Sequence, residues 1–253
     1  MMADTSRPLT RPVLLEVVVD TAAGLRVAAE NGADRIELCA ALSEGGLTPS
    51  MGLMTLAAEL DLPVRAMIRP RAGDFTYTLD EQHLMRLDIA AVAACGLEGV
   101  ILGANLADGR LDMAALQDLM SHARAHDLSV GLHRGFDLAP DATEALELAI
   151  ALGIDTILTS GGGNTAADGV PGLSHLVKQA NGRIEILAGK GITADNVSAI
   201  LASGVSSVHA SCSQPLPLRQ DRATALGYVN ASQSGTSAEA VAHLKSLLPG
   251  GTV

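Results

Sequence analysis

Charged and imidazole side chains recur near the ends of short hydrophobic stretches in this chain. In the stretch Asp34-Arg35-Ile36-Glu37-Leu38-Cys39, apolar residues alternate with Glu37 and Cys39. This alternation predicts a strand with one face against helices and the other toward an enclosed interior. A glutamate on the inner face, close to the end of the strand, is costly to bury without a partner. At the mouth of a parallel barrel, where strand C-termini carry catalytic groups, such a residue indicates function.

The same alternation predicts which way the side chains of the other strands point. Two carboxylates in one enclosed volume repel each other, so either Glu16 or Glu37 is expected to hold a proton and act as a general acid or base. The alternative is a structural network in which Arg69 neutralises both glutamates, because such networks also perturb pKa values. The residues expected to face inward near the strand ends are Glu16, Glu37, Cys39, Met67, Arg69, His133, His209 and Ser211.

Glycine and serine close three expected strands in the second half of the chain. These segments are Ser160-Gly161-Gly162-Gly163, Gly189-Lys190-Gly191 and Ser211-Cys212-Ser213. In eight-stranded barrels, the loops after strands seven and eight bind phosphate together with a helix N-terminus. A helix beginning near Thr193 would supply that N-terminus, and Arg69 or Arg134 would reach the other end of a small anionic ligand. The alternative is that these glycines only form tight turns.

Thiol and imidazole side chains form a candidate metal site at the same end of the strands. Cys39, Cys212, His133 and His209 would converge there, and thiolate with imidazole suits a soft ion such as Cu(I) or Zn. No local pair has metal-site spacing such as C-x-x-C or H-x-x-x-H, so spacing alone does not predict this site.

Three aromatic residues, Phe75, Tyr77 and Phe136, lie in expected loops and indicate either ligand contact or packing between loops.

The elements that must position these side chains alternate regularly along the chain. Eight strand-then-helix units predict an α/β fold in the form of a single (β/α)8 TIM barrel over residues 1–253. An open doubly wound sheet is the alternative, but the G-x-G-x-x-G turn typical of it is absent. The barrel is expected over 13–213, followed by a long polar loop at 214–236 and a last helix at 237–248. The expected strands are 13–19, 34–39, 64–69, 99–103, 128–133, 156–159, 184–188 and 207–210.

Composition limits the classes of partner. Hydrophobic residues make up 48% of the 253 residues, and the net charge of −11 argues against a nucleic-acid or anionic-membrane surface. The longest apolar run, 89–97, is too short to span a bilayer, and residues 1–11 show no apolar segment of a signal peptide. Three cysteines cannot all pair, which favours reduced thiols and a cytoplasmic location.

Several of these stretches resemble the CutC family of copper homeostasis proteins. The resemblance runs from about Leu15 to Ser211, and its first two motifs are long enough to be specific. It implies a TIM barrel, a cytoplasmic location, a homo-oligomer with a dimer favoured, and a role in copper tolerance. The matching segments are 31–39, Glu44-Gly45-Gly46-Leu47-Thr48-Pro49-Ser50, 68–77, His133-Arg134-Gly135-Phe136-Asp137, 158–162, 188–191 and 208–211.

The resemblance also implies site residues. Cys39 matches a family cysteine proposed to bind copper, whereas Val18-Val19 stand where many relatives carry a second cysteine. Cys212 is the candidate to replace that thiol. The residues that match motif positions of the family are Glu16, Glu37, Arg69, His133, Asp137 and His209.

Two functions from different classes follow from the sequence. One is a copper-binding or copper-handling protein, based on the family resemblance. The other is an enzyme acting on an anionic small molecule, such as a phosphorylated one. This hypothesis is based on the charged barrel mouth and the glycine loops. Fold alone does not decide between them, because this barrel supports many chemistries.

Overall fold

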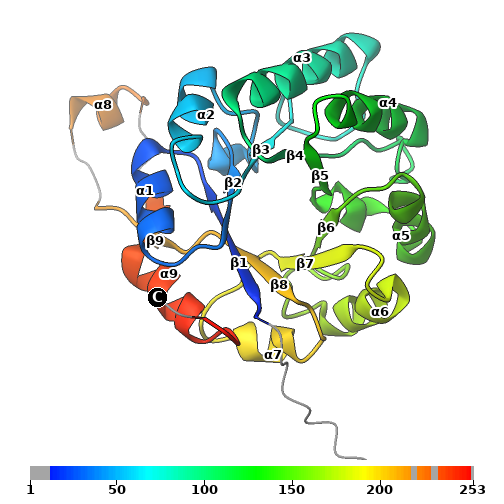
Figure 1. Cartoon of the computed structure of the whole chain (residues 1–253). Coiled ribbons are helices and arrows are strands. Elements are labelled where there is room, and N and C mark those ends of the chain that lie inside the picture. The colour runs from blue at the N-terminus through cyan, green and yellow to red at the C-terminus, as the bar shows by residue number, and fades with distance from the viewer. Residues whose placement is uncertain (1–11, 218–220, 229–232, 252–253) are drawn as a thin grey trace, which may run out of the picture.

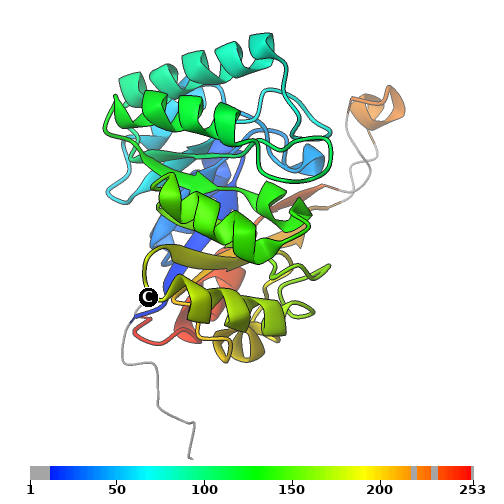
Figure 2. The ribbon, with the colours of Figure 1, turned by 90° about the vertical axis from the view of Figure 1, so that its right-hand side faces the viewer.

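The computed structural model describes residues 12–217, 221–228 and 233–251, and it contains a closed barrel of eight parallel strands in sequential order. Helices surround the strands (Figure 1), and α3 to α6 lie side by side along one side of the barrel (Figure 2). The TIM barrel expected from the sequence is therefore confirmed. The strands are β1 Leu14–Val19, β2 Arg35–Leu38, β3 Val64–Met67, β4 Gly99–Leu102, β5 Ser129–Leu132, β6 Thr156–Thr159, β7 Glu185–Gly189 and β8 Ser207–Ala210.

Most of the described helices begin where the sequence offers a side chain to cap them, whereas α6 and α7 have no side-chain cap. Thr21, Ser50 and Ser237 each accept a hydrogen bond from the first turn of the helix that follows. Thr78 and Glu81 form a reciprocal capping box at the start of the longest barrel helix. The helices are α1 Ala22–Glu30, α2 Met51–Ala57, α3 Leu79–Cys95, α4 Met113–Arg124, α5 Ala142–Ala151, α6 Val170–Ala180, α7 Val197–Leu201 and α9 Ala238–Ser246, with short 3-10 turns η1 Leu42–Glu44 and η2 Arg134–Leu138.

Strand register brings polar side chains together inside the barrel. Glu16 on β1 lies level with Arg35 on β2 and with His209 on β8, where the barrel closes. Glu37 lies level with Val18, one layer nearer the strand C-termini. Because successive inward residues are two apart, these layers stack along the barrel axis.

The lower end of the barrel contains a set of paired polar side chains, here called the floor network: Arg35, Arg65, Glu98, Thr156 and Glu185. Arg35, Arg65 and Thr156 are buried, whereas Glu185 is partly buried and Glu98 is exposed. Arg65 donates to Glu98 at 3.1 Å and to Thr156 at 2.9 Å, and the Thr156 hydroxyl donates to Glu185 at 2.6 Å. Glu185 in turn accepts from Arg35 at 3.3 Å. In the described part of the chain, the floor network leaves no buried side-chain nitrogen or oxygen without a partner.

The structure corrects two expectations about the last third of the chain. The segment 214–236 is not only loop: β9 Ser213–Pro215 pairs antiparallel with β10 Ser234–Thr236, and α8 Arg222–Ala225 lies between them. Part of this loop and residues 1–11 lie outside the described residues. The seventh helix begins at Val197 rather than near Thr193, because Asn196 Oδ1 accepts from the Thr193 backbone and the preceding residues form a turn.

Candidate functional site

A cavity of about 840 Å³ opens at the C-terminal ends of the strands, where active sites of this fold lie. Its walls come from the loops after β2, β3, β5, β7 and β8 and from α9. Glu16, Asp137, Ser160, Gly161, Gly162 and Gly189 do not line it. The expected site residues that do line it are Glu37, Cys39, Arg69, His133, Arg134, Lys190, Gly191, His209, Ser211 and Cys212.

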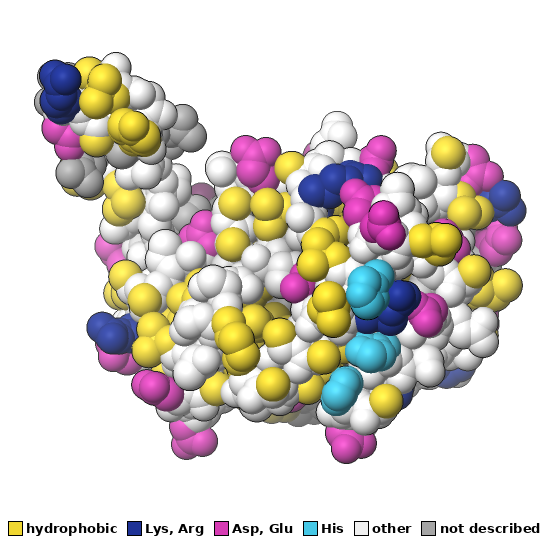
Figure 3. Space-filling view, turned by 90° about the horizontal axis from the view of Figure 1, so that it is seen from above, with side chains coloured by type: hydrophobic (Ala, Val, Ile, Leu, Met, Phe, Trp, Pro, Cys, Tyr) yellow, Lys and Arg dark blue, Asp and Glu magenta, His cyan; other side chains and the backbone are white. Residues whose placement is uncertain are grey.

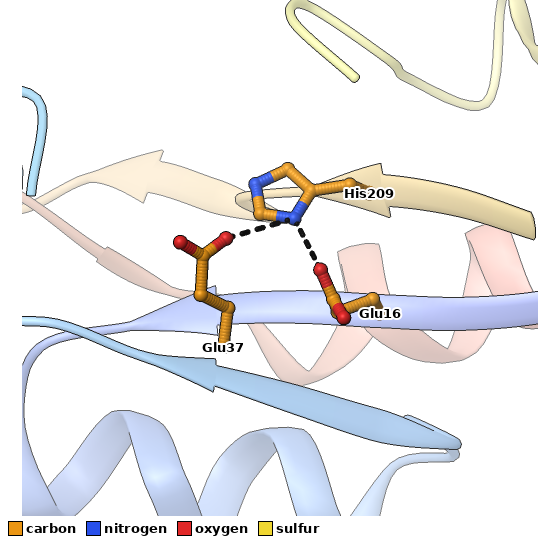
Figure 4. Close-up of side chains that lie close together, drawn as sticks. All are labelled: Glu16, Glu37 and His209. Carbon is orange, nitrogen blue, oxygen red and sulfur yellow. Dashed lines mark hydrogen bonds and ion pairs between the residues drawn. The ribbon is translucent and has the colours of Figure 1, made fainter. Parts of the chain in front are cut away.

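Glu16, Glu37 and His209 form the centre of the site (Figure 4). His209 Nδ1 donates a hydrogen bond to Glu16 Oε1 at 2.8 Å and lies 3.2 Å from Glu37 Oε2. Both glutamates are almost completely buried. These are also the one set of three or more potential metal ligands found within the described residues.

The pKa values of the two glutamates are shifted in opposite directions. Burial favours the neutral form of Glu16, but the His209 hydrogen bond and the charge of Arg35 outweigh it and lower its pKa to about 2. Burial raises the pKa of Glu37 to about 7, assisted by the charge of Glu16 and opposed by His209. Despite burial, the charge of Glu37 and the Glu16 hydrogen bond raise the pKa of His209. Of the two glutamates, Glu37 is therefore the one that takes up a proton more readily.

Arg35, which sequence reasoning missed, is the cation that neutralises Glu16. Its Nε donates to Glu16 Oε2 at 2.5 Å. Arg69, which was expected to neutralise the glutamates in the structural alternative, instead binds only backbone carbonyls. Arg35 shares the inward parity of Glu37, so alternation places it inside the barrel but does not show that it pairs with Glu16. The residue was overlooked because it stands at the start of its strand, away from the mouth.

His133 is held as a neutral imidazole. The Gly135 backbone N–H donates to its Nδ1 at 3.0 Å, which places the ring proton on Nε2. Burial, reinforced by the nearby charge of Arg69, lowers the pKa of His133 to about 4. The ring fits closely over Gly103, where an added Cβ would lie 2.4 Å from Cε1. His133 therefore presents a hydrogen-bond donor rather than a lone pair at Nε2.

The cavity thiols are protonated. Burial, together with the charge of Glu37, raises the pKa of Cys39 well above its usual value, and burial raises the pKa of Cys212 to about 11. The Cys39 thiol donates to Glu37 Oε1 across 3.8 Å. Cys39 also packs with Met67 in a small cluster separate from the main core.

Comparisons with known proteins settle the family. A family model described as the CutC family matches residues 13–214. The chain belongs to the CutC family. It is 52% identical to a family protein CutC from Agrobacterium fabrum and 47% identical to one from Rhizobium meliloti, over 94% and 93% of this chain and 94% and 96% of those proteins. A structure described as that of a copper homeostasis protein CutC from Streptococcus agalactiae is 31% identical, covers 79% of this chain and 98% of its own, and superposes with a TM-score of 0.74.

Asp137, one of the positions that matched the CutC motifs, lies beside the cavity and organises its wall. It accepts from Arg134 Nε at 2.9 Å, from Thr159 Oγ1 at 2.5 Å and from the Ser160 backbone at 3.0 Å. These contacts tie η2 to the end of β6. Asp137 therefore positions Arg134 at the cavity rather than reaching a ligand itself.

The glycine loops of this CutC protein divide into two kinds. After β6, an added Cβ at Gly172 would lie 2.0 Å from Gly161 O, so these glycines permit close packing of the loop on α6. This is the tight-packing alternative, and it removes Ser160, Gly161 and Gly162 from the cavity wall. After β7, Lys190 and Gly191 do line the cavity. Lys190 has a φ of +88°, a conformation that favours glycine.

Proposed function

We propose that this protein binds copper(I) in the mouth cavity and serves copper homeostasis, the role in the name of its Streptococcus agalactiae relative. Membership of the family supports the role, and the donor set of the cavity supports the site. Cu(I) prefers soft thiolate and thioether ligands and also binds imidazole. The cavity wall offers all three groups in Cys39, Met67 and His209, with Cys212 as a second thiol. In the described structure the cysteines and histidines do not already form a group of three ligands around one point, so copper binding would have to draw them together.

The surroundings of Cys39 are the observation that carries this proposal. An added Cβ at Gly46 would lie 3.0 Å from Cys39 Sγ and 3.6 Å from Met67 Cε, so the Cys39 sulfur and the end of the Met67 side chain lie close together beside Gly46. Metal binding requires the thiolate, so the thiol proton must leave. Glu37 already accepts that hydrogen bond, and its pKa of about 7 lets it take the proton near neutral pH. His133 is outside the proposed ligand set because its Nε2 carries the ring proton.

Competition titration tests the copper proposal. The parent, Cys39→Ser and Cys95→Ser are titrated with Cu(I) against a chelator under reducing conditions. Cys95 is the matched control, because its sulfur contacts Thr55 and the Met51 carbonyl rather than the cavity. We expect Cys39→Ser to lose about tenfold or more in affinity and Cys95→Ser to match the parent. Equal binding by all three proteins would remove copper from Cys39.

A second candidate function is acid–base catalysis on a small anionic molecule. It is supported by one observation, the opposite pKa shifts of Glu16 and Glu37 around the shared His209. Carboxyl groups whose pKa values are pushed apart are typical of acid–base pairs in enzymes. Proton exchange from D2O into small organic anions, followed by NMR with the parent and Glu37→Gln, tests it. Absence of exchange with the parent would count against catalysis of this type.

We also propose that the protein is a cytoplasmic homodimer. The segment around α8, between β9 and β10, stands off the barrel (Figures 1 and 3) and exposes apolar side chains, with Leu226 57% and Tyr228 83% exposed. An apolar surface of this kind supports docking on a second copy.

The three free thiols fit a reducing compartment. No helix in the described ranges has both the length and the apolarity needed to cross a bilayer. Light scattering of the parent and Tyr228→Ser tests the dimer.

A further inference from the structure

Arg69 is a buried cation whose charge no acidic side chain offsets within the described residues. It is 6% exposed. Its Nη1 donates to the carbonyls of Glu44 at 2.7 Å and Gly46 at 3.0 Å, and its Nη2 donates to Gly73 at 2.8 Å. Its Nε is buried and has no partner. Burying a charge without a counter-ion is strongly unfavourable, so the surroundings of Arg69 favour an anion from outside the chain.

His133 supplies a second buried donor on the same cavity. The Gly135 N–H occupies Nδ1, so Nε2 carries the proton, and Nε2 is also buried without a partner in the described structure. Unpaired buried N–H groups are rare in folded proteins because each one loses its hydration. Because both side chains line the same cavity, a bound ligand is the candidate for the acceptor that each N–H group lacks.

Phe75 places these two donors on one wall. The Arg69 guanidinium carbon lies 5.1 Å from the centroid of the Phe75 ring, and the His133 ring centroid lies 4.4 Å from it. All three side chains line the cavity. The Phe75 ring therefore contacts both side chains and brings them to the same wall of the cavity.

Glu37 provides the opposite polarity in the same cavity. Its Oε2 is buried and accepts no hydrogen bond from the described residues, although His209 Nδ1 lies 3.2 Å away. A ligand that satisfies all three unpartnered atoms needs an anionic acceptor at one end and an O–H donor elsewhere. A planar carboxylate offers two oxygens to two fixed N–H donors, whereas a phosphate group brings a third equivalent oxygen.

We propose that the mouth cavity binds a small hydroxy acid, with its carboxylate on Arg69 Nε–H and His133 Nε2–H and its hydroxyl directed at Glu37. The carboxylate end shares no residue with the proposed copper ligands, so this site goes beyond the copper role and stands or falls separately. It also places the anion on the β3 and β5 side of the mouth, away from the loops after β6 to β8 that the sequence indicated.

Calorimetry on metal-free, chelator-treated protein tests the site, so the result does not depend on copper. The probes are glycerate, propionate and inorganic phosphate, and the variants are Arg69→Lys, which keeps the charge but loses Nε–H, and His133→Phe, which keeps the ring. Because hydrogen bonds to a carboxylate are charge-assisted, we expect each variant to weaken glycerate binding about tenfold to a hundredfold. We expect the parent to prefer glycerate over both propionate and phosphate.

Controls separate this site from the alternatives. Arg86→Gln removes a cation that pairs with Asp118 on the outer helices, and it should leave glycerate affinity unchanged. Loss of binding in Lys190→Gln, with Arg69→Lys and His133→Phe unaffected, would place the anion at the loop after β7 and overturn the proposal. If Arg69→Lys fails to fold, the ¹⁵N signal of His133 Nε2 in the parent decides: it should shift on glycerate addition, and no shift at saturation contradicts the site. A parent that binds no glycerate also overturns it.

Discussion

The floor and the mouth of the barrel both contain buried charges, but these charges differ in whether a side chain of opposite charge pairs with them. Arg65 in the floor network donates to Glu98 and Thr156, which gives its charge an acidic partner. Arg69, four residues later on the same inward parity, binds only backbone carbonyls and leaves Nε unpartnered. In the described cavity wall, His133 Nε2 has no partner either, and Glu37 Oε2 accepts no hydrogen bond, although it lies 3.2 Å from His209 Nδ1.

This difference separates groups that stabilise the fold from groups that are left available to a ligand. Buried polar groups in native proteins are normally hydrogen-bonded, so exceptions gathered in one cavity need an explanation. The floor network shows that buried charges in this chain are paired where they serve only the stability of the fold. Glu16 lies at the boundary, since Arg35 joins it to the floor and His209 joins it to the mouth.

The largest expected effect comes from breaking the pair at this boundary. Arg35→Met leaves Glu16, which is fully buried, without its guanidinium partner. Removing one member of a buried ion pair costs about 3–5 kcal/mol, and we expect a loss of unfolding free energy of about 3 kcal/mol because His209 still bonds Glu16. Urea unfolding at pH 7 measures it.

The double variant Arg35→Met with Glu16→Met is the control for that prediction. Both charges are then absent, so the penalty for an unpaired carboxylate disappears. The double variant should be more stable than Arg35→Met alone. A single variant within about 1 kcal/mol of the parent would mean that the pair does not support the fold.

Glu37→Gln should change stability in a pH-dependent way. The pKa of Glu37 is raised in the folded protein from 4.5 to about 7, so the folded state holds this proton more tightly than the unfolded state. The contribution of the protonated carboxyl is full below pH 4.5 and is lost as the pH rises to 7. Glutamine does not titrate, so the variant should gain on the parent across this window, by on the order of 3 kcal/mol at most.

Unfolding free energies of both proteins at several pH values between 4 and 8 check the difference. The difference is informative because other carboxyl groups cancel between parent and variant. Glu98→Gln is the matched control, since that side chain is partly exposed and paired in the floor network. If the Glu37→Gln difference stayed constant over this range, the buried carboxyl would not hold its proton.

Alternation in the sequence was sufficient to predict the barrel and the inward direction of Glu37, Arg69, His133 and His209. It was not sufficient to predict partners, because these depend on register across strands far apart in sequence. Arg35 lies level with Glu16 only because β1 and β2 pair as they do, and His209 only because β8 closes on β1. The identity of the proton-sharing pair was therefore predictable, and its counter-ion was not.

Glycine was the least informative residue type. In the sequence, Gly161 and Gly191 look alike, yet one permits close packing on α6 and the other lines the cavity. Close packing leaves no room for a side chain at Gly161, whereas at Gly191 there is room and the φ of +71° favours glycine, so composition does not distinguish them. The same limit explains the expected helix start near Thr193, since Thr193 and Asn196 are both good capping residues and only the local turn decides between them.

The smallest expected effect concerns Lys190 at the cavity mouth, whose backbone conformation is strained in a way that a glycine would avoid. Its φ of +88° costs a non-glycine residue about 1 kcal/mol, and its side chain is exposed, so little packing is lost on truncation. Lys190→Gly should raise the unfolding free energy by about 0.5 kcal/mol, because glycine's greater unfolded-state entropy offsets part of the relief. Lys190→Ala keeps the strain and removes the same charge, so it should show no gain. Thermal unfolding of the three proteins checks the order. If both variants gained equally, the charge rather than the backbone would be the cost, and the mouth would differ from the floor by electrostatics alone.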